Sequence, residues 1–216
     1  MARSIHAFDL DHTLFKGNSS YCFGRYLYQQ KYFPYSDWLF ILFASLRFKV
    51  GLLPIERLHH DAFARLFSGR SQLEIDQMAE RFLKICFEGM VYLPALKRLE
   101  QVQQEGHLTV LLSSSPDFLV SKIAKRFNIP VCHGTQYAVD KDRRFCHISH
   151  LILGTEKAQI LENLGRQYGI AKRDTFAYSD SHLDLPFLLS AGSAIGVNPN
   201  RKLRTLCRQN QWPIIT

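Results

Sequence analysis

Short apolar segments alternate with helical patterns toward both ends of the chain, and this alternation indicates the fold class. Residues 4–9 form an apolar run that ends in acidic residues, and residues 107–112 form a second run. Two more runs, at residues 174–180 and 193–198, follow later. Short strands alternating with helices are typical of an α/β protein with a parallel sheet. We therefore expect one sheet whose strands come from both ends of the chain.

The intervening segment has the pattern of a helical insertion. Its apolar positions between Ile75 and Cys86 recur at helical spacing, after a capping box that pairs Ser71 with Glu74. Further along, residues 135–148 predict a β-hairpin with its turn at residues 140–143. The expected domains are a parallel-sheet core, residues 1–16 and 106–216, and an inserted all-helical cap, residues 17–105.

Residues 37–48 are apolar on every side of the helix that they predict. The segment is shorter than the roughly 20 residues that span a bilayer. We favour a buried helix of the cap. The alternative is an interfacial helix that touches lipid, with Arg47 and Lys49 at its end.

The composition and net charge restrict the classes of partner that the protein is expected to bind. The 216 residues are 46% hydrophobic, enough for one core and a smaller unit, and carry a formal net charge of +8. Such a balance favours anionic partners, which are phosphorylated small molecules, acidic membrane surfaces or nucleic acid. No segment resembles a nucleic-acid-binding motif, so we expect no nucleic-acid partner. The sequence does not indicate an oligomeric state.

The cysteines and the N-terminal residues favour a cytoplasmic protein. The five cysteines are scattered, odd in number and include no Cys-x-x-Cys pair, which favours reduced thiols. No apolar stretch of a signal peptide precedes the first polar motif. Histidines such as His59 and His60 are expected to be structural or surface residues rather than zinc ligands.

Two aspartates, Asp9 and Asp11, follow the first predicted strand. Buried carboxylates are costly unless they are paired, hydrogen-bonded or bound to a cation, and two together repel. At the carboxyl end of a strand, Asp9 could attack phosphorus. Asp11 could protonate the leaving oxygen and then deprotonate the attacking water. Taken alone, the pair also fits a metal site or a turn.

The second motif is the serine run after residues 107–112. We expect Ser113 to end that strand and to offer its hydroxyl to a phosphate oxygen, with Ser114 beside it. Ser115 is the expected N-cap of a helix that starts at Pro116, whose free N–H groups would face an anion. An ordinary capped loop is the alternative.

The third and fourth motifs supply a cation and more carboxylates. Lys157 lies in the first turn of a predicted helix that Thr155 would cap, where a lysine opposes the helix dipole and needs an anionic neighbour. It could stabilise both Asp9 and a transferring phosphoryl group. Asp180 suits Mg²⁺ as a ligand. Asp184 would either lie behind the direct ligands and hold them in place, or bind the ion itself, directly or through water. A surface lysine and an acidic turn are the alternatives.

Together these motifs resemble the haloacid dehalogenase superfamily of phosphatases. The residues "DLDHT", "LLSSS", "GTEK" and "SDSHLD" match its pattern in order, in the branch (subfamily IB) that contains phosphoserine phosphatase and has a helical C1-type cap. The resemblance implies a Rossmann-like core and an Mg²⁺-dependent phosphatase. It makes Asp9 the nucleophile and Asp11 the general acid/base. It assigns Mg²⁺ to the Asp9 side chain, the Asp11 carbonyl and Asp180, and the phosphoryl group to Ser113 and Lys157.

Two departures from that family bear on the substrate. Asn18 stands where phosphoserine phosphatases carry a glutamate for the substrate ammonium, and Leu183 stands where many members have asparagine. The apolar cap instead resembles that of relatives acting on phospholipid head groups. We expect a small phosphorylated metabolite or a phospholipid head group as substrate. Phosphoserine hydrolysis, phosphoryl transfer to another alcohol, and a non-catalytic anion- or membrane-binding role are the alternatives.

Overall fold

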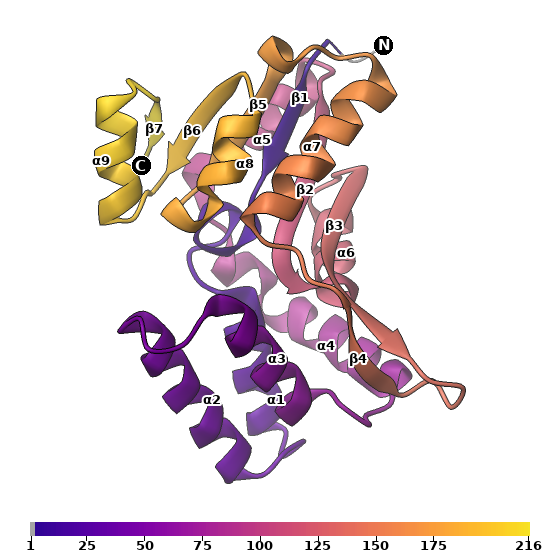
Figure 1. Ribbon diagram of the computed structural model, residues 1–216. Coiled ribbons are helices and arrows are strands. Elements are labelled where there is room, and N and C mark those ends of the chain that lie inside the picture. Colours follow the sequence, from indigo (N-terminus) through magenta and orange to yellow (C-terminus); the bar gives the residue numbers. More distant parts are fainter. Residues whose placement is uncertain (1–2) are drawn as a thin grey trace.

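The computed structural model describes residues 3–216 and confirms the predicted α/β fold. A seven-stranded sheet has the order β4-β3-β2-β1-β5-β6-β7, with β1 at its centre (Figure 1). Every neighbouring pair is parallel except β3 and β4, which form the predicted antiparallel hairpin. The strands are β1 (Ile5–Phe8), β2 (Leu108–Pro116), β3 (Val131–Val139), β4 (Phe145–His150), β5 (Thr175–Ser179), β6 (Ser193–Val197) and β7 (Ile214–Ile215).

Helices cover both faces of the sheet and also form a group beyond its lower edge in Figure 1. Helices α7 and α8 lie on one face of the sheet, and α5 and α6 lie on the other. The helices are α1 (Ser19–Gln29), α2 (Tyr35–Lys49), α3 (Ile55–Leu66), α4 (Gln72–Met90), α5 (Leu93–Gln104), α6 (Asp117–Arg126), α7 (Gly154–Tyr168), α8 (Leu185–Ser190) and α9 (Arg201–Gln209). Three shorter helical turns are η1 (Leu10–Leu14), η2 (Lys172–Asp174) and η3 (His182–Asp184).

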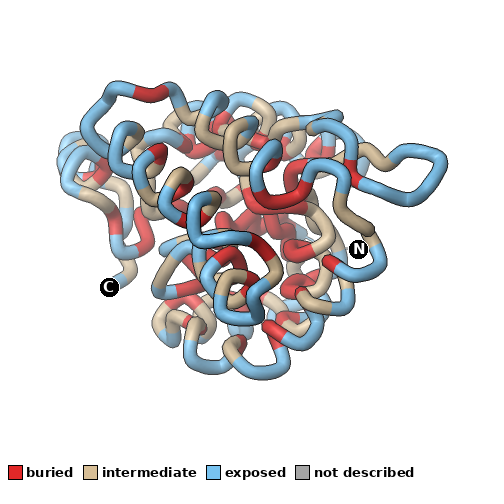
Figure 2. Tube along the Cα trace, turned by 90° about the horizontal axis from the view of Figure 1, so that it is seen from below, coloured by how far each residue is buried: buried red, intermediate tan, exposed pale blue. Residues whose placement is uncertain are grey.

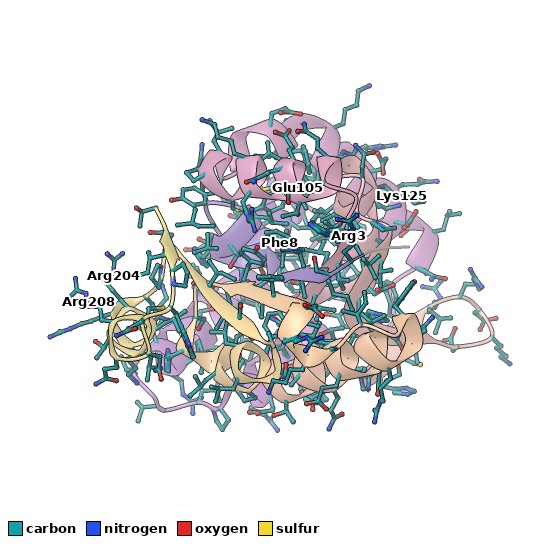
Figure 3. The ribbon with its side chains drawn as sticks, turned by 90° about the horizontal axis from the view of Figure 1, so that it is seen from above. Arg3, Phe8, Glu105, Lys125, Arg204 and Arg208 are labelled. Carbon is teal, nitrogen blue, oxygen red and sulfur yellow. The ribbon has the colours of Figure 1, made fainter. Side chains whose placement is uncertain are left out.

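The central strand β1 is buried on both faces, as its apolar sequence requires. Ile5 and Ala7 join the hydrophobic cluster under α7 and α8, whereas Phe8 joins the larger cluster that continues into the helical group. Figure 3 shows Phe8 in the middle of the molecule, while Arg204 and Arg208 of α9 project outward. Side-chain alternation along β1 therefore ties one strand to two separate cores.

The inserted segment supplies helices to two places. Helices α1 to α4 lie together beyond the carboxyl ends of β1 and β2 (Figure 1). The last inserted helix, α5, instead packs against β2. An isolated bridge between Phe15 and Val91 joins the two crossings of the chain between core and insertion. Seen from below, buried residues gather in the interior of the helical group, and exposed ones form its outer rim (Figure 2).

Helix α2 differs from the favoured expectation of a buried helix. Trp38, Ile41 and Ala44 are buried, but Phe43 and Leu46 are 61% and 57% exposed. The expectation was wrong for one side of the helix because, among the described residues, α2 packs mainly against α1 and α3, which cover the other side. No helix within residues 3–216 is both long enough and apolar enough to cross a bilayer.

Two predicted helix caps were also wrong. Strand β2 continues to Pro116, so Ser115 is a strand residue and α6 begins one residue beyond the expected start. Helix α7 begins at Gly154, and its N-terminus is closed by the Glu156 carboxylate, which accepts a hydrogen bond from the Leu153 N–H, rather than by Thr155. Ser71 caps α4 by accepting from the Glu74 N–H, which is one half of the expected capping box, whereas the Glu74 carboxylate accepts from the Tyr32 hydroxyl. All five cysteines are free thiols.

Candidate active site

A buried ion-pair cluster lies where the central strands end. The Lys157 ammonium donates to Asp9 Oδ1 at 2.6 Å and to Asp184 Oδ1 and Oδ2 at 3.0 and 2.8 Å. Lys157 is only 3% exposed, so the two carboxylates replace the water that its charge has lost. The structure therefore brings together three predicted site residues that are up to 175 positions apart in numbering, from Asp9 to Asp184.

Asp9 is fixed by the end of β1. Its N–H donates to the Tyr178 carbonyl at 2.9 Å, which extends the pairing of β1 with β5 by one residue. Its second carboxylate oxygen, Oδ2, accepts from the Thr13 hydroxyl at 3.1 Å. The chain can curl back in this way because His12, at φ 59°, adopts the left-handed conformation inside η1. The Asp9 carboxylate is thus held on both oxygens.

Asp184 is held by Lys157 of α7 and by one neighbour in its own segment. It lies in η3, and the Ser179 hydroxyl at the end of β5 donates to its Oδ2 at 2.8 Å. With the two contacts from Lys157, the Asp184 carboxylate accepts three hydrogen bonds, and both of its oxygens have a partner. The geometry fits a residue that positions the lysine.

Burial strongly affects the proton affinities of the cluster. It raises the pKa of Asp9 to about 7; Lys157 opposes that rise, while Asp184 and Asp11 add to it. It raises the pKa of Asp180 to about 8, with further contributions from the Asp9 and Asp184 charges. Burial would by itself lower the pKa of Lys157, but the two carboxylates raise it above its ordinary value. Lys157 therefore stays charged while the carboxylates compete for too little positive charge.

This imbalance matches the donor set for a divalent cation. Lys157 pairs with Asp9 and Asp184, and no ion pair within residues 3–216 involves Asp180, so three neighbouring carboxylates face one ammonium group. Over the same residues, no group of three His, Cys, Asp or Glu side chains is arranged to hold a metal alone. The expected Mg²⁺ ligands do not require three such side chains, because they are two carboxylates, of Asp9 and Asp180, and the backbone carbonyl of Asp11. Hard oxygen donors with excess negative charge fit Mg²⁺.

Asp11 points to the start of the insertion. Its Oδ1 accepts from the Ser19 N–H at 2.7 Å, and its Oδ2 accepts from the Asn18 side chain at 3.1 Å and the Ser115 hydroxyl at 2.9 Å. Asn18 also caps α1 by accepting from the Tyr21 N–H at 2.7 Å. The Asp11 carboxylate is therefore attached to the N-terminus of α1, where the helix dipole favours an anion.

The three serines of residues 113–115 make two kinds of contact: Ser113 and Ser114 bond within the core, and Ser115 also reaches Asp11 and the start of α1. Ser113 is buried, and its hydroxyl accepts from the Ser115 N–H at 3.1 Å. The Ser114 carbonyl accepts from the Thr135 hydroxyl at 2.8 Å, which joins β2 to β3. Ser115, which was expected only to cap a helix, contacts the Asp11 carboxylate and the hydroxyls of Ser19 and Ser20.

Four residues near the site could not be assigned from the sequence. Thr13 and Ser179 each support a carboxylate, and only the polar motifs around them could have indicated this. His59 of α3 was expected to be structural or on the surface. Burial lowers its pKa to about 4, and the charges of His60 and Lys157 lower it further. Ser115 was the fourth, because its contact with Asp11 depends on folding.

Comparisons with known proteins agree with this geometry. The family model for haloacid dehalogenase-like hydrolases matches residues 7–189. The phosphoserine phosphatase SerB1 of Mycobacterium tuberculosis (strain ATCC 25618 / H37Rv) is 31% identical over an alignment of 215 positions, which covers 96% of this chain and 68% of that protein.

Solved structures share the fold. A protein of unknown function from Bordetella pertussis Tohama I superposes with a TM-score of 0.88 at 22% identity, over 100% of this chain and 99% of the other. A phosphoserine phosphatase solved as an analogue of its phospho-aspartyl intermediate gives 0.71 at 16% identity, over 99% and 93%. At these identities the likeness concerns architecture alone.

Proposed function

Since this chain belongs to the haloacid dehalogenase-like hydrolases and is a phosphatase of the phosphoserine-phosphatase-like branch, we propose that it hydrolyses phosphomonoesters with Mg²⁺ through an aspartyl-phosphate on Asp9. The observation that supports this most is the buried contact of Lys157 with Asp9 and Asp184. In this contact the Asp9 carboxylate lies beside a fixed positive charge at the carboxyl end of the central strand, which is what a nucleophile toward a phosphoryl group would need.

The proposed reaction has two steps. An oxygen of Asp9 attacks phosphorus, the bond to the alcohol oxygen breaks, and Asp11 gives that oxygen a proton. Asp11 then takes a proton from water as the water attacks the same phosphorus, which releases inorganic phosphate and restores Asp9. Lys157 neutralises charge on Asp9 and on the phosphoryl oxygens, and Ser113 and Ser114 bind the phosphoryl group.

The metal site belongs to the same proposal. The Asp9 side chain, the Asp11 carbonyl and Asp180 would hold Mg²⁺, and Asp184 would support the site through Lys157. When bound, the ion would neutralise charge on the phosphoryl group.

We also propose the domain roles. The core comprises residues 1–16 and 106–216, and the insertion, residues 17–105, supplies the cap α1–α4 together with α5. The cap would select the substrate and exclude water. The enzyme would work in the cytoplasm, where free thiols persist.

The substrate we propose is a small phosphorylated metabolite or a phospholipid head group. Asn18 caps α1 and donates to Asp11, so it offers no carboxylate to a substrate ammonium, which argues against phosphoserine. Phosphoserine hydrolysis and phosphoryl transfer to an alcohol remain the competing activities. Product analysis distinguishes phosphoryl transfer from hydrolysis, because a transferase forms a new phosphomonoester instead of inorganic phosphate.

An Asp9→Asn variant tests the proposal. We expect it to lose nearly all turnover of an aryl phosphate and of any active compound in a panel of phosphorylated amino acids, sugars, nucleotides and lipid head groups. Asp142→Asn, in the exposed turn between β3 and β4, makes the same chemical change away from the site and should keep full activity. Equal turnover by Asp9→Asn and the parent would disprove the role of Asp9.

A further inference from the structure

One side of helix α2 exposes a continuous row of apolar side chains. The exposed positions follow one another at intervals of four, four, three and four residues, so they share one face of the helix. Their exposed fractions run from 45% to 61%. The row, here called the α2 stripe, consists of Tyr35, Leu39, Phe43, Leu46 and Val50.

The rest of the protein leaves the α2 stripe uncovered. The opposite side of α2, with Trp38, Ile41 and Ala44, packs into the protein. Among the described residues, α2 contacts mainly α1 and α3, and Figure 1 shows it at the outer edge of the helical group, away from the sheet. Leu52, in the turn after α2, is 69% exposed and adds to the apolar area. A contiguous exposed apolar surface marks an interaction site.

The charges around the α2 stripe are positive. Arg47 and Lys49 are exposed beside it. The one acidic residue of α2, Asp37, is mostly buried and already pairs with Arg65 at 3.3 Å. The whole chain has a formal net charge of +8. An apolar row with cations beside it is complementary to an anionic lipid surface, where the chains accept the apolar groups and the head groups accept the cations.

We propose that the α2 stripe binds the surface of an anionic membrane, with α2 lying parallel to the bilayer plane. The helix would present about 22 Å of length to the interface. A second copy of the chain fits less well, because pairing of two such stripes would supply no free carboxylate for Arg47 or Lys49. The membrane contact is independent of the phosphatase chemistry.

Vesicle sedimentation tests the membrane contact. The parent protein should bind vesicles of phosphatidylglycerol with phosphatidylcholine, and should bind pure phosphatidylcholine at least about tenfold more weakly, since the basic residues add electrostatic attraction. The double variant Phe43→Ser with Leu46→Ser should lose about tenfold or more in binding to the anionic vesicles. The matched control is Leu73→Ser with Ile85→Ser, which alters exposed apolar residues of α4 and should bind like the parent.

Two further measurements separate membrane binding from misfolding and from self-association. Turnover of a soluble aryl phosphate should be equal in all these proteins, which shows that they are folded and separates this inference from the proposed reaction. Arg47→Gln with Lys49→Gln should lose the preference for phosphatidylglycerol. The inference is overturned if the parent does not bind anionic vesicles, or if the control loses binding equally. It is also overturned if sedimentation velocity shows a dimer that Phe43→Ser with Leu46→Ser dissociates.

Discussion

Ser115 illustrates how one residue can connect the core with the cap. Its hydroxyl, in β2, lies 2.9 Å from Asp11 Oδ2, 3.0 Å from the Ser19 hydroxyl and 2.7 Å from the Ser20 hydroxyl. Ser19 and Ser20 begin α1. The proposed acid/base is therefore held by the core and by the first turn of the cap at once, which makes Ser115 a positioning residue.

Ser115→Ala should slow catalysis in a way that depends on the leaving group. An alkyl phosphate needs a proton on its leaving oxygen, so we expect its kcat to fall about tenfold or more, which is part of the roughly 10²–10⁴-fold that general acid catalysis contributes. A nitrophenyl phosphate needs little protonation and should change much less. Ser121→Ala, a hydroxyl on α6 that only donates to the Phe118 carbonyl, is the control. Equal losses with both substrates would argue against this role.

His6 makes folding stability depend on pH. It is buried in β1, between the Ser4 hydroxyl at 3.1 Å and the Tyr178 hydroxyl at 2.9 Å. Arg98 Nε donates to the same Tyr178 hydroxyl at 3.1 Å. Burial, with Arg98 and His107, lowers the pKa of His6 to about 3.

The consequence is a loss of stability in mild acid. Below pH 6.5 the unfolded chain takes up a proton at His6, whereas the folded chain stays neutral until about pH 3, so stability falls as pH drops through that window. His6 should account for about 2 kcal/mol of the loss between pH 7.5 and pH 5. Urea unfolding at both pH values should show a smaller loss for His6→Gln than for the parent or for His147→Gln. An unchanged loss in His6→Gln would contradict the assignment.

At the level of elements, the approach of α7 to η3 sets the position of Lys157. A Cβ at Gly154 would lie 2.6 Å from the Leu183 carbonyl oxygen and 3.3 Å from the Asp184 Cα, both backbone atoms that cannot turn aside. Only glycine allows the N-terminus of α7 to lie so close to η3. That contact brings Lys157 within reach of Asp184.

Gly154→Ala should therefore harm both stability and activity. Forcing the two backbones apart should cost about 1–3 kcal/mol of unfolding free energy and lower kcat, because Lys157 shifts from Asp184. Gly89→Ala is the contrasting variant, since a Cβ there meets open space inside α4. It should keep activity and gain about 0.5–1 kcal/mol. Thermal melts and kinetics check both, and a Gly154→Ala enzyme as stable and active as the parent would refute this role of Gly154.

At the scale of the whole molecule, the candidate site is a product of chain topology. Asp9 follows β1, and Asp180 follows β5, which pairs with β1 in the sheet, while Lys157 lies in the first turn of α7. The assembly leaves more negative than positive charge at one edge of the sheet. Folding concentrates that charge, so a bound cation should stabilise the entire fold.

Mg²⁺ should accordingly raise the melting temperature. A concentration 100 times the dissociation constant contributes about 2.7 kcal/mol, or roughly 5–10 °C for a chain of this size. Asp180→Asn should remove most of this shift and also melt higher than the metal-free parent, because one repelling carboxylate is gone. Asp142→Asn should respond to Mg²⁺ like the parent. Equal shifts in Asp180→Asn and the parent would exclude Asp180 as a ligand.

The sequence by itself determined the strands at both ends of the chain, the helical insertion and the family. These depend on local periodicity and on motifs whose residues are close in sequence, as in Asp9 with Asp11. The same local patterns misplaced the caps at Ser115 and Thr155, because strand pairing and a glutamate decided where those helices begin.

Only the tertiary structure decided which polar groups meet and which apolar faces stay uncovered. The contacts of Lys157 with Asp184 and of Ser115 with Asp11 join segments that sequence spacing cannot bring together. Helix α2 is apolar all round in sequence, yet half of it faces outward because its neighbours cover one side only. The physical reason is the same in each case: burial and pairing depend on what other elements place nearby, and that information is absent from any single stretch of chain.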